Sequence, residues 1–91
     1  MGADGHRHAI EAARHCDRLY LEPCWSHAPG GRFARVAAEV DASRLLFGTD
    51  ATLIDPASAF GAVAAAGLTE ALAERVAWRN AAELFGLPIR P

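Results

Sequence analysis

Apolar residues recur every three or four positions in two stretches of the N-terminal half, and this spacing predicts amphipathic helices at residues 6–16 and 32–40. Charged residues such as Glu11 and Arg14 occupy the opposite side of the first helix. The apolar stripes consist of Ala9, Ala12, Ala13 and Cys16 in the first helix and Phe33, Val36, Ala37 and Val40 in the second. Each helix therefore has one face suited to burial.

Two short runs are apolar without a helical period. Residues 18–22 (RLYLE) and 44–48 (RLLFG) are predicted to be buried strands, and Pro23 ends the first of them. One helix connects them, and such a unit pairs its strands in parallel through a right-handed crossover. Because a parallel sheet needs many strands and cover on both faces, two strands indicate a piece of a larger layer or barrel.

Two further helices are predicted from their capping residues. Asp55 is a preferred N-cap residue and Pro56 a preferred first helical residue, so a helix is predicted to begin there. Gly67 is suited to end that helix. Thr69 is a suitable N-cap for the next helix, which we expect to extend to Arg79.

A last helix is predicted from Asn80 to Gly86, because Asn80 and Glu83 have capping-box spacing. The predicted order is α-β-α-β-α-α-α, with two parallel strands. We therefore expect an α/β chain in which residues 1–91 form a single partial domain.

The composition limits the classes of partner. All nine basic residues are Arg, the net charge is −2 and no basic patch is present, so we expect no nucleic-acid partner. No apolar run approaches the roughly 18 residues that span a bilayer, and the N-terminus lacks a signal-peptide core, so we expect a cytoplasmic protein with no membrane partner. Hydrophobic residues make up 52% of the chain, which predicts self-association of a chain this short.

Asp50 is the strongest candidate for chemistry. It follows the apolar run that ends at Gly48, and in α/β barrels the active site gathers at the C-terminal ends of the strands. A carboxylate at such a place can bind a divalent metal or transfer a proton. The alternative is that Asp50 caps a turn, which Asp often does.

Four segments resemble motifs of the amidohydrolase superfamily, in its amidohydrolase-related branch. Residues 45–51 (LLFGTDA) resemble its LFGTDAP or LFGSDYP signature, and residues 78–87 (WRNAAELFGL) resemble its closing GNAARLFGL helix. Residues 8–22 resemble a helix and strand of the family, and Met1-Gly2 resembles a His-Met-Gly motif without its His. The motifs follow one another in the family's order over nearly the whole chain, and we expect a longer reading frame upstream.

The resemblance implies the C-terminal third of a (β/α)8 TIM barrel that binds one or two divalent metals, often zinc. Members hydrolyse amides, esters or lactones, or decarboxylate aromatic and unsaturated acids, so a small-molecule substrate is implied. Asp50 matches the Asp after the last strand, which would touch the metal and relay a proton. Trp25, Ser26 and His27 follow the other strand at the same end and are expected to line the substrate pocket. A barrel takes about 250 residues, so we expect the isolated chain to bind no metal and to be inactive.

Other polar residues have simpler interpretations. His6 and His8 have ligand spacing, but no strand precedes them, so we interpret them as solvated residues at a helix start. Cys24 and His27 have zinc-like spacing without a paired second motif, and Cys16 lies on the apolar stripe, so a structural zinc site is disfavoured. A second hypothesis for the function is a non-enzymatic interaction module that self-associates through open strand edges.

Overall fold

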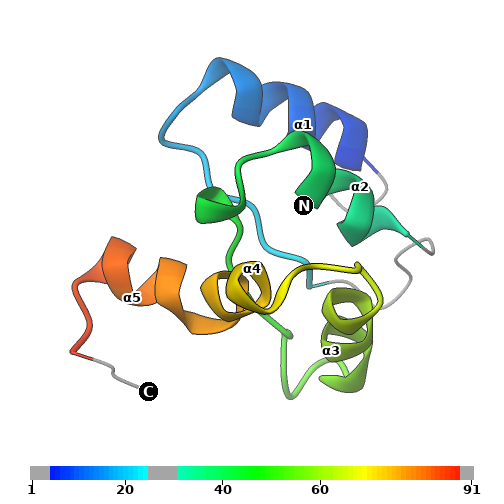
Figure 1. Cartoon of the computed structure of the whole chain (residues 1–91). Helices are drawn as coiled ribbons and strands as arrows, with labels where there is room; N and C mark the ends of the chain where they lie inside the picture. Colours follow the sequence, from blue (N-terminus) through cyan, green and yellow to red (C-terminus); the bar gives the residue numbers. More distant parts are fainter. Residues whose placement is uncertain (1–4, 25–30, 89–91) are drawn as a thin grey trace.

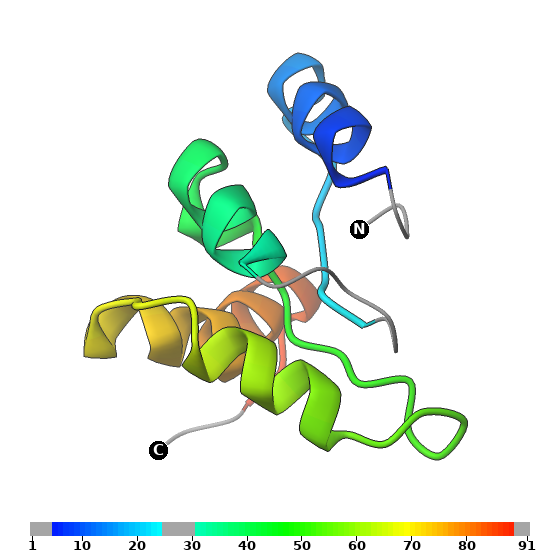
Figure 2. The ribbon, with the colours of Figure 1, turned by 90° about the vertical axis from the view of Figure 1, so that its right-hand side faces the viewer.

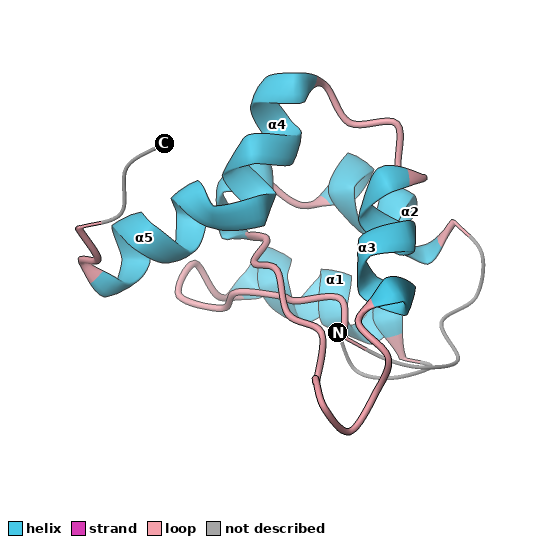
Figure 3. Cartoon of the chain, turned by 90° about the horizontal axis from the view of Figure 1, so that it is seen from below, coloured by secondary structure: helices cyan, strands magenta, loops and turns pink. Residues whose placement is uncertain are grey.

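The computed structural model describes residues 5–24 and 31–88, which form helices joined by extended loops (Figures 1 and 3). The helical elements are α1 (His6–His15), α2 (Arg32–Glu39), the 3-10 turn η1 (Ala42–Arg44), α3 (Ala57–Ala64), α4 (Glu70–Glu74), the π-helical segment η2 (Arg75–Arg79) and α5 (Asn80–Phe85). α2 packs between α1 and α3, while η1 lies against η2.

The predicted α/β architecture is wrong for the described residues, because neither 18–22 nor 44–48 forms a strand and no sheet is present among them. The two segments meet in one isolated parallel bridge between Leu21 and Leu45. The Leu21 N–H donates to the Arg44 carbonyl at 3.0 Å, and the Leu46 N–H donates to the Leu21 carbonyl at 2.8 Å. Figure 2 shows the first segment leading down from the end of α1.

The physical reason is a lack of further strand partners. A parallel ladder is stabilised by neighbours on both edges and by cover on both faces, and each of these segments has a single neighbour. Side chains instead bond the carbonyls of the first segment. The Arg44 guanidinium donates from Nη2 to the Leu19 carbonyl at 2.8 Å and also reaches the Cys16 carbonyl. Apolar runs predicted the contact between the segments but not how far it would extend.

The helices predicted from hydrophobic spacing are present. α1 ends at His15 and α2 at Glu39, each one residue before its predicted end. Asp55 caps the start of α3 as predicted, since its Oδ1 accepts the Ala57 N–H at 2.9 Å. α3 ends at Ala64, and the chain then turns through Gly67, whose φ is 70°. A positive φ of this kind favours glycine, which has no Cβ to clash.

The predicted boundary at Asn80 is wrong, because α4, η2 and α5 follow one another without a gap from Glu70 to Phe85. Thr69 caps the start of this helix as predicted, with its hydroxyl accepting the Leu72 N–H at 3.3 Å. Gly86 ends the helix as predicted, at a φ of 64°. Asn80 has helical backbone angles, so it is an interior residue of the helix and not a cap.

The core lies where α1 and α2 pack on the two bridged segments. It is built from the buried apolar side chains Ile10, Ala13, Leu21, Phe33, Val36, Val40, Leu45 and Val76. Leu45 is fully buried, whereas Phe60, Phe85 and Leu53 are 61%, 64% and 88% exposed. Apolar burial is therefore concentrated around the bridge, and the loop after residue 50 and the far helices keep exposed apolar side chains.

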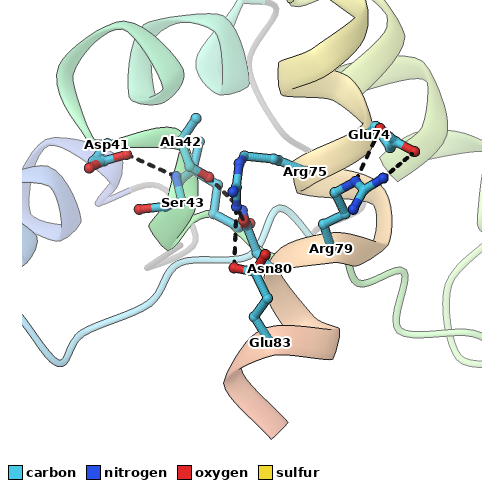
Figure 4. Close-up of polar contacts among 9 residues, drawn as sticks. Asp41, Ala42, Ser43, Glu74, Arg75, Arg79, Asn80 and Glu83 are labelled. Carbon is cyan, nitrogen blue, oxygen red and sulfur yellow. Dashed lines mark hydrogen bonds and ion pairs between the residues drawn. The ribbon is translucent and has the colours of Figure 1, made fainter. Parts of the chain in front are cut away.

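The side chain of Asn80 joins the C-terminal helix to the bridged segment (Figure 4). It is 2% exposed, and its Nδ2 donates to the carbonyls of Ala42 and Leu45, the latter at 2.7 Å. Its Oδ1 accepts from Arg75 Nη1 at 3.1 Å. Every polar atom of this buried amide therefore has a partner, as buried polar groups require.

Replacing Asn80 by Ala should lower the free energy of unfolding by roughly 2–4 kcal/mol, because the carbonyls of Ala42 and Leu45 would lose their donor while remaining largely shielded from water. Urea unfolding followed by circular dichroism measures the change. Glu83→Ala is the matched control one turn along the same helix. It removes only an exposed ion pair with Arg75, so it should change stability by less than about 0.5 kcal/mol. Equal changes in the free energy of unfolding for the two substitutions would show that the hydrogen bonds of the Asn80 amide do not stabilise the fold.

Candidate functional site

Asp50 lies in the loop that follows the bridged segment, and its side chain is exposed. Its backbone has a φ of 55°, in the left-handed region that Asp and Asn tolerate better than most residues. The Ile54 N–H donates to the Asp50 carbonyl at 3.0 Å, and the Thr49 hydroxyl accepts the Ala51 N–H at 3.1 Å. The turn therefore fixes the backbone of Asp50 and leaves its carboxylate accessible.

Glu22 and Cys24 approach Asp50 from the other segment. The Glu22 carboxylate accepts the Cys24 N–H at 3.2 Å and also accepts the Cys24 thiol. Asp50 is near enough to this thiol for its side chain to help raise the pKa of Cys24. Glu22 also lies over Gly48, where an added Cβ would come within 2.9 Å of its carboxyl carbon. The ends of the two segments therefore bring together two carboxylates and one thiol.

Burial raises the pKa of the Cys24 thiol to about 12, and hydrogen bonds and charge from Glu22 and Asp50 contribute further. Two carboxylates disfavour a third negative charge between them, so the thiol keeps its proton at neutral pH. Cys24 is therefore a hydrogen-bond donor here and not a nucleophile or a thiolate ligand.

The neighbourhood of Asp50 was predicted only in part. Its position after the apolar run is as expected, and Cys24 lies beside it, at the end where the substrate loop was placed. The proposed substrate residues Trp25, Ser26 and His27 lie outside the described residues. Glu22 was not singled out as a site residue, although it ends the predicted strand at the same edge as Asp50, which is the signal that could have found it.

The remaining candidates lie elsewhere in the fold. His6 and His8 occupy the first turn of α1, at the predicted helix start. His8 is exposed as expected, whereas His6 is half-buried with its Nδ1 shielded from solvent, so the expectation of a solvated side chain is wrong for His6. Cys16 follows α1 and is exposed, so its predicted place on the buried stripe is wrong.

The described residues do not by themselves fit a catalytic metal. Within 5–24 and 31–88, no group of three or more His, Cys, Asp or Glu side chains converges in a way that could hold an ion. Asp50 is beside a thiol that retains its proton, and a catalytic zinc site uses about three protein ligands. No chemical step of this chain is therefore assigned to a metal.

A profile of the amidohydrolase family matches residues 2–87, which is nearly the full length of the chain. The chain belongs to the amidohydrolase family. This confirms the relationship indicated by the motifs around Asp50 and in α5. Comparisons with curated proteins and with solved structures gave no match.

Two properties of this amidohydrolase chain bear on its expected cofactor and environment. The family is generally metal-dependent, while the part of the chain that the structure describes contains no metal-binding cluster. None of its described helices is long and apolar enough to cross a lipid bilayer.

Alkylation of Cys24 should be slow at neutral and mildly alkaline pH. Since the pKa rises from 9.0 to about 12, the reactive thiolate should be about a thousandfold scarcer than in a free thiol. Iodoacetamide labelling with peptide mass spectrometry follows Cys24 and Cys16 in the same sample, so the exposed Cys16 is the internal control. The Cys24 rate should keep rising with pH above 9. Labelling of Cys24 as fast as that of Cys16 at pH 8 would contradict the assigned environment.

Proposed function

We propose that this chain supplies Asp50 as the acid–base carboxylate of an amidohydrolase active site. The observation that carries the proposal is the position of Asp50, an accessible carboxylate at the end of the LLFGTDA motif with a second segment end beside it. In hydrolysis of an amide, ester or lactone, the Asp50 carboxylate would take a proton from the attacking water. It would then return that proton to the leaving group as the carbonyl adduct collapses.

The substrate class that we propose is a small carboxylated or cyclic molecule, consumed by hydrolysis or decarboxylation. Asp50 is the proton carrier in either reaction. Because Cys24 lies beside Asp50, the three residues that follow it, Trp25, Ser26 and His27, are our proposed substrate-binding residues.

We propose that the 91-residue chain does not turn over substrate by itself. Its described residues offer Asp50 as a carboxylate ligand for a divalent metal, which we propose is zinc, and they offer no complete ligand set. The remaining ligands would have to come from outside the described residues.

Asp50→Asn should leave the stability of the chain within about 0.5 kcal/mol of the parent, because Asn tolerates the same left-handed backbone and the carboxylate is exposed. In a barrel rebuilt by joining this chain to the N-terminal part of a family relative, the same substitution should lower turnover by a factor of roughly 10²–10⁴. Urea unfolding and assays on lactone, ester, amide and unsaturated acid substrates, with divalent metal supplied, measure the two effects.

Glu70→Gln is the matched control for the activity assay, since Glu70 is an exposed carboxylate on α4, far along the chain from the motif. It should leave turnover unchanged. If Asp50→Asn unfolds the chain, Asp50 is a structural cap. If the rebuilt barrel keeps its turnover with Asn at this position, the acid–base role is wrong.

A second proposal is that the chain self-associates through exposed apolar side chains. The open strand edges of the original hypothesis do not exist in the described residues. Leu53 and Phe85, at 88% and 64% exposed, instead offer apolar surface that water disfavours. This contact would serve as an interaction surface whether or not Asp50 is catalytic.

The chain should therefore sediment above its monomer mass of 9.7 kDa, increasingly so at higher protein concentration. Leu53→Glu and Phe85→Glu should shift it toward the monomer, because each replaces exposed apolar surface by charge. Ala71→Glu, at an exposed helical position, is the control and should have no such effect. A parent chain that stays monomeric at all concentrations would rule out this proposal.

A further inference from the structure

A polar groove lies between α1 and α2, which pack against each other (Figure 1). Its volume is about 520 Å³, which falls within the range of roughly 300–1,000 Å³ that small-molecule sites occupy. Arg7 and Arg14 line the groove from α1 and Arg35 lines it from α2, beside the buried side chain of Ile10. The groove therefore gathers three of the nine basic residues of the chain.

Only the folded chain brings these arginines together. Arg7 and Arg14 are seven residues apart, which is close to two helical turns, so both project from the same face of α1. Arg35 belongs to the other helix and is more than twenty residues away in the sequence. No run of basic residues announces the groove, because its guanidinium groups come from two separate helices.

Two carboxylates also line the groove, but each has its own loose partner. Arg35 Nη2 lies 3.8 Å from Glu39 Oε1, and His15 Nε2 lies 3.9 Å from Glu11 Oε1. Both pairs are exposed to solvent, and exposed contacts of this length contribute little. Three guanidinium groups against two carboxylates leave the groove positively charged, although the net charge of the whole chain is −2.

We propose that this groove binds a small molecule with two anionic groups, either carboxylates or phosphates, and that Arg7 and Arg14 are its principal ligands. Among residues 5–24 and 31–88, no ion pair joins either of these arginines to a carboxylate, so binding breaks no internal contact of theirs. A guanidinium donates paired N–H bonds to the oxygens of a carboxylate or phosphate. Asp50 does not line the groove, so this site is independent of the acid–base role proposed for Asp50.

The spacing of the two arginines fits a ligand with two charged ends. Seven residues of α-helix rise by about 10 Å, and both long side chains can bend toward each other over the groove. A single small anion would engage one guanidinium at a time, whereas a dianion engages both. Arg35 on the opposite wall adds a third donor group, and the buried Ile10 offers an apolar surface to the carbon atoms between the two charges.

The test is isothermal titration calorimetry on the full 91-residue chain at neutral pH. Pyrophosphate and succinate are titrated separately, with sodium chloride adjusted so that ionic strength stays constant. The variants are Arg7→Gln, Arg14→Gln and Glu11→Gln. Arg18→Gln is the matched control, because Arg18 is exposed and lies outside the groove, so its replacement removes the same charge elsewhere. Circular dichroism confirms that each variant is folded.

We expect saturable binding of at least one probe with one site per chain. Arg7→Gln and Arg14→Gln should each weaken it about fivefold or more, since each removes a charge-assisted hydrogen bond. Glu11→Gln should strengthen it about twofold, because it removes a like charge from the groove, whereas loss of a merely structural residue would weaken binding. Arg18→Gln should change the affinity by less than about twofold.

The two probes distinguish the sources of the anion. Binding of pyrophosphate alone identifies a phosphorylated ligand, and binding of succinate alone identifies a dicarboxylate. The proposal is wrong if neither probe gives saturable heat. It is also wrong if Arg18→Gln weakens binding as much as Arg7→Gln and Arg14→Gln do, since the attraction would then be to the charge of the whole chain and not to this groove.

Discussion

The buried amide of Asn80 is the interaction on which the arrangement of this chain depends. It donates to two carbonyls of the 42–45 segment, and that segment in turn pairs with Leu21. Among residues 5–24 and 31–88, this amide supplies the hydrogen bonds that join the C-terminal helix to the segment leading to Asp50. Buried carbonyls that lose a donor are costly, so the position of this segment is tightly specified. The place of Asp50 in space follows from a hydrogen bond made thirty positions later in the sequence.

A common pattern links this amide to the rest of the site. Where a larger sheet would satisfy backbone groups with further strands, this chain satisfies them with side chains. Arg44 bonds the carbonyl of Leu19, and Asn80 bonds that of Leu45. Near Asp50, the Glu22 carboxylate accepts the Cys24 N–H within the same segment. A family member that carries a barrel motif can therefore keep two segments in parallel contact without forming a sheet, because long polar side chains reach carbonyls that a ladder leaves open.

The sequence predicted local structure well and pairing poorly, for physical reasons. Helices such as α1 and α2 follow from the hydrophobic period of their own residues, and caps such as Thr69 bond to backbone groups only a few residues away. A strand depends on neighbouring strands that its own residues do not specify. The prediction of paired strands at 18–22 and 44–48 was therefore wrong, and the two runs share a single bridge. Asn80 was misassigned for the same reason. Its spacing with Glu83 suits a capping box, and only the fold shows that its partners are distant carbonyls.

In the candidate site too, local signals could be predicted from the sequence and contacts between distant segments could not. Asp50 could be found because its motif is local and resembles that of a known family. For Glu22 the sequence offers only its place at the end of the predicted strand, because its contact with Cys24 and the open space at Gly48 appear only in the fold. In the structure, Gly48 makes room for the side chain of Glu22 from the other segment. Such a role is visible only when both segments are placed.

Exposed apolar side chains lie close to Asp50, so a partner that covered them would also change the surroundings of its carboxylate. The exposed Leu53 lies three residues after Asp50. Phe47, three residues before Asp50, contacts the exposed Phe60 in a tilted arrangement with ring centroids 4.8 Å apart. A surface that buried Leu53 and Phe60 would also displace water from around Asp50. Lower local polarity strengthens every charge and hydrogen bond at a reacting centre, whereas an exposed carboxylate is screened by solvent. If both proposals hold, association and the acid–base role of Asp50 would be coupled, since the same contact that buries the apolar surface would enclose the Asp50 carboxylate.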